Sequence, residues 1–418
     1  MKGLIFTYLL TYGGAAVALF NPFVGLLVYC SFAIVRPEAM WPWAVPQQGY
    51  YARTIAICLL IGWILRGLGD WNFGRAHKIV VALLAYFAWA AVSTLAASYP
   101  TDWTFMENAS KYVLPWIVGI TTITSMRQVR TLAWVLMLSQ AYVAYEQNLI
   151  WVFGDRVVIS HGFAGMDNNC NAISMVTGAG LAFFLGMTTP STILRWLSFI
   201  CAGMMAHYPM FAQSRGGMLA LVIVGLVSFF LLPKKPRYFA YFGLAIAAGI
   251  RLAGPSVWDR FNTSFEGEGS LDESAQSRLD LWRDAIDMIQ RYPLFGVGPD
   301  NFPVVAREYG WAGAKECHSL WMQTAAELGL PGIALLLSFY GLSIVGLWRY
   351  SHTIAETDPW ETCFARAVIA SLVGFGVAAQ FVTLEGLELP YYVALVGAAV
   401  LKLGPKPSAP RMLSEFPS

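Results

Sequence analysis

The chain has 418 residues, of which 57% are hydrophobic and only 12% are charged. Soluble globular domains contain about 25% charged residues, so the composition excludes that class and indicates an integral membrane protein. The formal net charge is +2 at pH 7, and no run of Lys or Arg is long enough to form a nucleic-acid interface, so nucleic acid is excluded as a partner.

Apolar runs that could cross a lipid bilayer recur along the chain. A spanning helix needs about 20 predominantly apolar residues. The windows that approach this length are 4–20, 22–36, 53–68, 79–97, 111–125, 131–152, 170–188, 193–211, 217–232, 238–253, 330–348, 363–383 and 389–403. They predict an all-α polytopic protein with about twelve or thirteen transmembrane helices. The first window is read as a retained span, and the first two windows could form a kinked pair, a re-entrant hairpin or two true spans.

Basic residues in the short loops predict the orientation, because Lys and Arg mark the cytoplasmic side. Four loops carry them, within residues 66–78, 127–130, 234–237 and 349–366. The loops at 98–110, 153–169 and 254–326 then share the opposite, external side. The sequence thus divides into N-terminal transmembrane helices at 1–253 (about ten spans), a periplasmic loop at 254–328, C-terminal transmembrane helices at 329–403 and a cytoplasmic tail at 404–418.

The long external segment has helical patterning of its own. Between Glu273 and Arg291, apolar residues recur at spacings of three and four, which is typical of an amphipathic helix. The apolar face assigned from this pattern consists of Leu279, Trp282, Ile286 and Ile289. Tyr292-Pro293 ends the helix, and a second short helix is expected from His318 to Leu328.

Two arginines on the predicted external side could bind an anion. Arg215 begins a span directly before two glycines, and Arg278 lies in the first turn of the amphipathic helix. A guanidinium group matches phosphate oxygens bidentately, and the N-terminus of a helix also favours anions. The alternatives are that Arg215 snorkels at the membrane interface and that Arg278 is simply solvated. We interpret Arg283 and Arg291 as solvated charges.

His318 is the one histidine of the long external segment. An imidazole titrates near neutral pH, so it can take a proton from an attacking hydroxyl group, although a single histidine is more often structural. The six cysteines show no metal-ligand spacing, and we expect neither a metal site nor a cofactor. Further candidates for substrate contact are Arg156, His161, Asp167, Asn168, Asn169, Glu385 and Glu388.

Several motifs in a fixed order resemble the O-antigen ligase and polymerase superfamily. They are Ser214-Arg215-Gly216-Gly217, then Ser277-Arg278-Leu279-Asp280-Leu281-Trp282 with Pro293-Leu294-Phe295-Gly296-Val297-Gly298, then His318-Ser319-Leu320-Trp321-Met322-Gln323 with Glu327-Leu328-Gly329-Leu330-Pro331-Gly332. Gly165-Met166-Asp167-Asn168-Asn169 is similar to a motif of the O-glycosylation-ligase-like branch. The resemblance covers roughly residues 160–350.

The resemblance implies a GT-C-like glycosyltransferase of the bacterial inner membrane whose active site faces the periplasm. Such enzymes transfer a glycan from undecaprenyl diphosphate to an acceptor hydroxyl, usually without a metal ion. Carried onto this sequence, Arg215 and Arg278 match the arginines assigned to the donor diphosphate, and His318 matches the histidine assigned as base.

The acceptor is left open by the sequence. A ligase acting on lipid A-core is favoured by the motifs at 167–169 and 214–216. A polymerase would use a lipid-linked repeat unit, and a protein O-oligosaccharyltransferase would use Ser or Thr. A transporter of lipid-linked sugars is a different class, which would place charged residues inside the spans rather than in one external loop.

Overall fold

The computed structural model describes residues 2–154, 166–236, 273–354, 359–383 and 386–404, together with isolated positions between 238 and 251. These residues form helices and no β-strand, which confirms the predicted all-α class. The α-helices in chain order are α1 (Lys2–Tyr8), α2 (Gly14–Phe20), α3 (Pro22–Val35), α4 (Pro37–Met40), α5 (Tyr51–Leu65), α6 (His77–Ala96), α7 (Thr104–Thr122), α8 (Met126–Val152), α10 (Asn168–Thr188), α11 (Thr192–Phe211), α12 (Arg215–Leu231), α14 (Glu273–Arg291), α15 (Phe302–Val305), α16 (Leu320–Ile354), α17 (Pro359–Ala378) and α18 (Leu389–Leu403).

Six helical segments of the described chain are long and apolar enough to cross a membrane. They are Lys2–Phe20, Pro22–Met40, Gly74–Ala96, Asn168–Thr188, Leu320–Thr353 and Pro359–Ala378, and α5, α12 and α18 are shorter apolar helices. The protein is therefore a polytopic membrane protein. Apart from 238–253, which is described only in part, each predicted window coincides with a helix, and the number of spans beyond these six stays a prediction.

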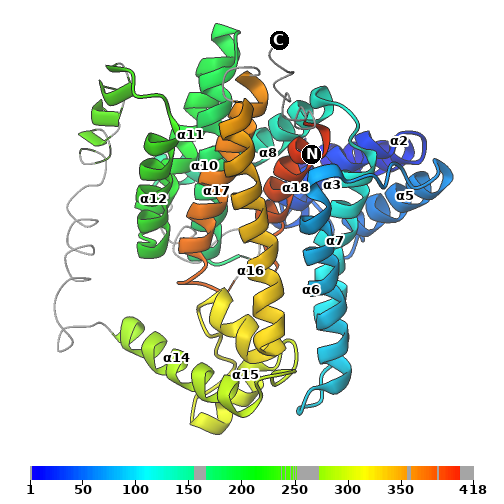
Figure 1. Ribbon diagram of the computed structural model, residues 1–418, viewed down its shortest axis with the longest axis vertical. Coiled ribbons are helices and arrows are strands. Elements are labelled where there is room, and N and C mark those ends of the chain that lie inside the picture. Colours follow the sequence, from blue (N-terminus) through cyan, green and yellow to red (C-terminus); the bar gives the residue numbers. More distant parts are fainter. Residues whose placement is uncertain are drawn as a thin grey trace, which may run out of the picture.

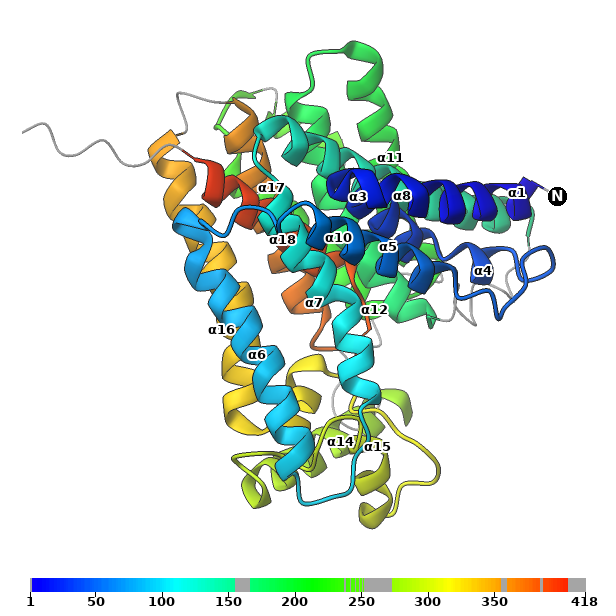
Figure 2. The same cartoon turned by 90° about the vertical axis from the view of Figure 1, so that its right-hand side faces the viewer.

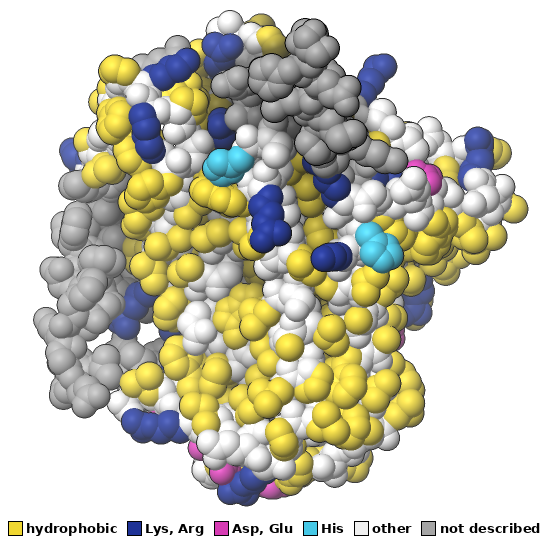
Figure 3. Space-filling model, in the orientation of Figure 1, with side chains coloured by type: hydrophobic (Ala, Val, Ile, Leu, Met, Phe, Trp, Pro, Cys, Tyr) yellow, Lys and Arg dark blue, Asp and Glu magenta, His cyan; other side chains and the backbone are white. Residues whose placement is uncertain are grey.

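The helices form a bundle around α10, which contacts α8, α11, α12, α17 and α18 (Figure 1). Nearly all of α10 is buried, as is α18. The outer surface is different, because large hydrophobic side chains such as Ile193, Trp196 and Phe230 are exposed there. Figure 3 shows a broad apolar surface on one face of the bundle, as contact with lipid requires.

The first two apolar windows form a helical hairpin. The helical run Lys2–Phe20 breaks at Asn21, whose side-chain oxygen caps α3 by accepting a hydrogen bond from the Val24 N–H. A Cβ atom on Gly14 would lie 2.4 Å from Val28 Cγ1, and one on Gly25 would lie 2.5 Å from Ala18 Cβ. These pairings show that the two helices pack closely and antiparallel, with glycine where the backbones meet.

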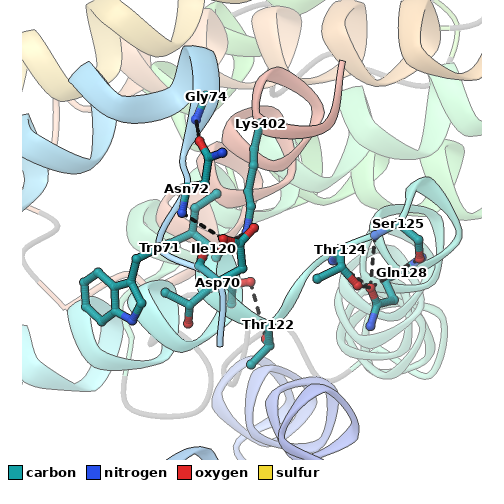
Figure 4. Close-up of polar contacts among 12 residues, drawn as sticks. Asp70, Trp71, Asn72, Gly74, Ile120, Thr122, Thr124, Ser125, Gln128 and Lys402 are labelled. Carbon is teal, nitrogen blue, oxygen red and sulfur yellow. Dashed lines mark hydrogen bonds and ion pairs between the residues drawn. The ribbon is translucent and has the colours of Figure 1, made fainter. Parts of the chain in front are cut away.

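The segments predicted to be cytoplasmic lie together at one end of the bundle. Lys402 Nζ donates to the carbonyl oxygens of Ile120 (2.7 Å) and Asp70 (3.2 Å), and it thereby joins the ends of α18 and α7 to the loop before α6 (Figure 4). A cation is favourable at the carboxyl end of a helix such as α7. The Arg75 guanidinium also lies 4.9 Å from the centre of the Tyr350 ring.

The opposite end carries a polar module, which we define as residues 273–328. Figures 1 and 2 show its helices α14 and α15 below the bundle, connected to it by α16. The module has a hydrophobic cluster of its own, formed by Leu281, Ala285, Met288, Val297, Phe302, Val305, Ala306, Cys317 and Ala326. Tyr99 donates to Glu308 (2.9 Å) and Thr101 to the Pro299 carbonyl (2.8 Å), so the loop before α7 joins the module, in agreement with the prediction that the two share one side.

The predicted bounds of the amphipathic helix are confirmed, since α14 runs from Glu273 to Arg291. The predicted apolar face is partly wrong, because Leu279 and Ile286 are 36% and 46% exposed. The buried stripe consists of Leu281, Ala285 and Met288, with Trp282 and Ile289 packed beside it. Apolar residues occupy about half of the circumference here, so periodicity alone does not determine which side meets the protein.

Two glycines allow the module to attach to α16. Gly329 interrupts α16 with φ +70°, and a Cβ atom there would lie 2.1 Å from the Leu294 carbonyl oxygen. A Cβ atom on Gly296 would lie 2.2 Å from the Glu327 carbonyl oxygen, at φ +69°. Two backbone hydrogen bonds join the same two segments. The Val297 N–H donates to the Ala326 carbonyl (2.9 Å), and the Leu330 N–H donates to the Pro293 carbonyl (2.8 Å). Residues 293–298 thus contact the backbone in the first part of α16, and this contact fixes the position of the residues that precede α16.

Candidate functional site

His318 lies at the junction of the polar module and the bundle, two residues before α16 begins. Its φ of +53° is unusual for a residue with a Cβ atom, so surrounding contacts must hold it. The Cys317 N–H donates to Gln323 Oε1 (3.0 Å), and the Cys317 carbonyl accepts from Trp282 Nε1 (3.1 Å). On the other side, the Leu320 N–H donates to the Ala379 carbonyl at 2.8 Å. The backbone is therefore fixed on both sides of a partly buried imidazole.

The electrostatic surroundings favour a neutral imidazole. Burial lowers the pKa of His318, and the positive charges of Arg278 and Lys315 lower it further, while the carboxylate of Asp167 acts in the opposite direction. A histidine whose pKa is lowered from its usual value near 6.5 is unprotonated at neutral pH. His318 can therefore accept a proton, as a general base must.

Arg278 lies on the buried side of α14. From Arg278, the residues Leu281, Ala285 and Met288 follow at intervals of three, four and three positions, so they lie on the same side of the helix as Arg278. Arg278 is partly buried, as its interaction with His318 requires. Arg283 and Arg291 point outward instead, with side chains 71% and 63% exposed, and they pair with Asp280 and Asp287 on the same helix. The prediction that these two are solvated charges is confirmed, and Arg278 differs from them in facing the site.

Arg215 is the first residue of α12, at the same end of the bundle. Ser214 caps this helix by accepting from the Gly217 N–H (3.2 Å), and its hydroxyl donates to Asn169 Oδ1 (2.8 Å). Asn168 Nδ2 donates to the Ala212 carbonyl (3.1 Å). The two asparagines therefore tie the start of α10 to the turn before Arg215.

The glycines that follow Arg215 allow its helix to begin close to the site. A Cβ atom on Gly216 would lie 2.9 Å from Phe381 Cβ, and one on Gly217 would lie 2.9 Å from Ala172 Cβ on α10. The segment that contains Phe381 also holds the start of α16, since the Leu320 N–H lies 3.0 Å from the Val382 carbonyl. The N-termini of α10, α12 and α16 thus meet at one end of the bundle, which is where Arg215, Asp167 and His318 stand.

Of the other predicted site residues, three lie outside the described part of the chain. Arg156, His161 and Glu385 lie outside the described residues. Glu388 is described and forms an ion pair with Arg36 (3.1 Å). No group of three or more His, Cys, Asp or Glu side chains that could hold a metal ion occurs within the described part of the chain.

A cavity of about 1090 Å³ lies beside this site. Its walls come from α3, α4, α5 and α7, from the start of α10, from Thr383 and from residues 386–388. Asp167, whose charge acts on His318, also lines the cavity. We call it the Arg36 cavity, because Arg36 lines it and contacts two other lining residues, the Glu388 carboxylate (3.1 Å) and the Gly386 carbonyl (3.4 Å).

Gln323 and Glu327, for which the sequence predicted no role, hold the residues around His318 in place. Glu327 is fully buried and accepts from the N–H groups of Asp300 (3.2 Å) and Phe302 (3.0 Å) and from Gln323 Nε2 (3.1 Å). Gln323 in turn receives the Cys317 N–H and the Thr383 hydroxyl (2.9 Å) on its Oε1. The sequence indicates this pairing by the spacing of the two residues, which lie four positions apart and therefore on one face of a helix.

Comparison with known families agrees with the resemblance seen in the motifs. Residues 199–337 match the family model Wzy_C, described as O-antigen ligase. The match includes α12, α14 and the first part of α16, and with them Arg215, Arg278 and His318. No curated protein matches the sequence. This segment is therefore similar to the O-antigen ligase family.

Proposed function

We propose that the protein is an inverting, metal-independent glycosyltransferase of the bacterial inner membrane, acting at the periplasmic face. It transfers a glycan from undecaprenyl diphosphate to an acceptor hydroxyl, with lipid A-core as the favoured acceptor. The observation that carries the proposal is the proximity of Arg278 to a partly buried His318 whose pKa is lowered. An unprotonated imidazole beside a guanidinium suits a reaction that removes a proton and releases an anion.

The reaction forms one bond and breaks one. The acceptor oxygen attacks the anomeric carbon, the bond from that carbon to the diphosphate oxygen breaks, and His318 takes the hydroxyl proton. The electron pair of the broken bond remains on the undecaprenyl diphosphate, whose growing charge Arg215 and Arg278 stabilise. A diphosphate leaves without protonation, so one base and two cations suffice, and a single displacement inverts the anomeric centre.

The membrane orientation is part of the proposal. The basic loops meet at the end of the bundle where Lys402 and Arg75 lie, and the polar module lies at the other end. Basic loops stay in the cytoplasm, so the site would face the periplasm, where lipid-linked glycans are joined to their acceptors. Polymerase and protein O-oligosaccharyltransferase activities would use the same site with another acceptor.

The test is transfer by the purified protein in lipid nanodiscs, supplied with an undecaprenyl-diphosphate glycan and lipid A-core. We expect a covalent product, and we expect a loss of about 10²-fold or more in His318→Ala, because a positioned base contributes about 10²–10⁴-fold. His352→Ala is the matched control, since this exposed histidine lies near the other end of α16. Full activity of His318→Ala would overturn the assignment, and movement of the donor across vesicles without any product would indicate a transporter.

A further inference from the structure

A second cavity lies at the other end of the bundle, on the side of the basic loops. It measures about 200 Å³. Its walls come from the end of α10, from the segment that follows α12 and from the first two turns of α17, three helices that pack against one another (Figure 1). Since α10 and α12 begin at the proposed active site and end here, this cavity is separate from that site. We call it the Arg366 cavity, after the one charged residue in its described lining.

Arg366 has donors to offer to this cavity. It is partly buried, and it forms no hydrogen bond or ion pair with the part of the chain that the structure describes. Other cations at this end have partners, because Arg195 donates to the Thr189 carbonyl (3.2 Å) and the Arg130 guanidinium lies 3.8 Å from the centre of the Trp360 ring. A guanidinium group carries five N–H donors and is costly to bury without acceptors. Arg366 therefore favours an anionic group beside it.

The surroundings of Arg366 are those of an anion site. The hydroxyl-bearing residues Thr188, Tyr238 and Thr362 line the same cavity, and its described lining contains no carboxylate. The charges of Arg366 and Arg130 both act on Cys363, so two cations lie near the start of α17. A guanidinium matches phosphate oxygens bidentately, and hydroxyl groups can donate to the oxygens that remain.

The position of the cavity favours a lipid as the source of the phosphate. Pockets for drug-sized ligands measure about 300–1,000 Å³, so this smaller cavity admits a headgroup and not a whole lipid. Large apolar side chains are exposed on both sides of it, Phe230 (70%) just before Leu232 of the lining and Phe239 (51%) just after Tyr238. Exposed aromatic residues of this kind contact acyl chains in a membrane protein. Basic pockets between membrane helices are typical binding sites for anionic headgroups.

We propose that the Arg366 cavity binds the phosphate of an anionic phospholipid from the leaflet at this end of the bundle. Arg366 and the hydroxyl groups bind the phosphate oxygens, and the acyl chains lie outside, along Phe230 and Phe239. The bound phosphate compensates the charge of Arg366 and holds the ends of α10, α12 and α17 together. The lipid therefore stabilises the bundle, and its binding does not depend on the transfer reaction.

Removing the charge tests the site. Native mass spectrometry of the full chain, purified in detergent, would measure the binding of one phosphatidylglycerol and of one phosphatidylcholine with the same acyl chains. We expect phosphatidylglycerol to bind at least 10-fold more tightly, because the choline of the other lipid would lie near Arg366 and Arg130. Arg366→Gln should lower the affinity for phosphatidylglycerol at least 10-fold, since hydrogen bonds between charged partners are strong.

The matched control is Arg349→Gln, which removes an exposed arginine near the same end of α16 and should change the affinity less than 2-fold. Met187→Trp fills the cavity and keeps Arg366, so it tests the site even if Arg366→Gln does not fold, and it should also lower the affinity at least 10-fold. Equal affinity in wild type and Met187→Trp, or equal losses in Arg366→Gln and Arg349→Gln, would overturn the proposal.

Thermal unfolding distinguishes a lipid from a free anion. Phosphatidylglycerol should raise the Tm of the delipidated wild type and leave the Tm of Arg366→Gln unchanged, because a ligand stabilises only a fold that binds it. Millimolar inorganic phosphate should neither raise the Tm nor displace the lipid. An equal rise with inorganic phosphate, or displacement of the lipid by it, would make a free anion the ligand and overturn the lipid assignment.

Discussion

The two sides of His318 differ in the charged groups they present. On one side, burial lowers the pKa of His318, and the positive charges of Arg278 and Lys315 lower it further. On the other side, the Arg36 cavity pairs its arginines with carboxylates of distant segments, as Arg36 does with Glu388. A guanidinium group stabilises an anion, whereas a guanidinium paired with a carboxylate presents hydrogen-bond donors and acceptors together.

The comparison also holds within one helix. Arg278 and Arg283 are close in sequence on α14, yet Arg278 faces His318 and Arg283 is 71% exposed and paired with Asp280. The same residue type thus occupies a position beside His318 and a solvated position five residues apart. Surface pairs of the second kind contribute about 0–1 kcal/mol, so the two arginines offer an internal control.

The largest effect is expected from removing the cation on the donor side. In Arg278→Ala, transfer should fall by on the order of 10²-fold, because one group that stabilises developing negative charge typically contributes this much. In Arg283→Ala it should change less than 2-fold, since an exposed pair contributes little. The measurement is kcat/KM for the donor with acceptor in excess, and equal losses in the two variants would show that the faces of α14 do not differ in function.

A smaller loss of activity is expected from replacing Gln323, which binds both the residue before His318 and Thr383 on the cavity wall. Gln323→Leu removes the acceptor of the Cys317 N–H and of the Thr383 hydroxyl, and a buried group left without its partner costs about 1–3 kcal/mol. We expect kcat to fall about 10-fold while the KM values for donor and acceptor change less than 2-fold, because Gln323 acts through the backbone before His318. Gln323→Glu keeps an acceptor oxygen for the Cys317 N–H but places a second carboxylate against the buried Glu327, so it should not restore the activity. A change confined to the donor KM would instead place Gln323 on the donor side.

Much of the donor side could be predicted from the sequence because it is encoded locally. The extent of α14 follows from its periodicity and from Tyr292-Pro293, and Arg215, Arg278 and His318 lie within short motifs. The face of α14 was only partly predictable, since Leu279 and Ile286 fit the period as well as Leu281 and Ala285 do. Burial of the second pair is decided by packing against Val297, Cys317 and Ala326, which no local rule supplies.

The cavity side could not be predicted in this way. Arg36 and Glu388 are separated by 352 positions, and each resembles an ordinary charge at the end of a span. Asp167 was predicted only as part of a possible substrate motif, and its position between the cavity and His318 results from the packing of α10 among α8, α11 and α17. Tertiary packing brings these residues together, so only coordinates reveal them.

The smallest expected effect is a shift of the pH profile, and its direction should differ between changes on the two sides of His318. The activity of a base is lost as the pH falls through its pKa, and the pKa of His318 is lower than usual. Arg278 lowers this pKa and Asp167 raises it, so Arg278→Gln should move the acidic limb of the kcat/KM profile to higher pH and Asp167→Asn should move it to lower pH. Asparagine also caps helices well, so the second variant should keep the start of α10. Arg283→Gln should leave the limb in place, and shifts of the same sign in the first two variants would mean that His318 does not lie between a cationic side and a carboxylate side.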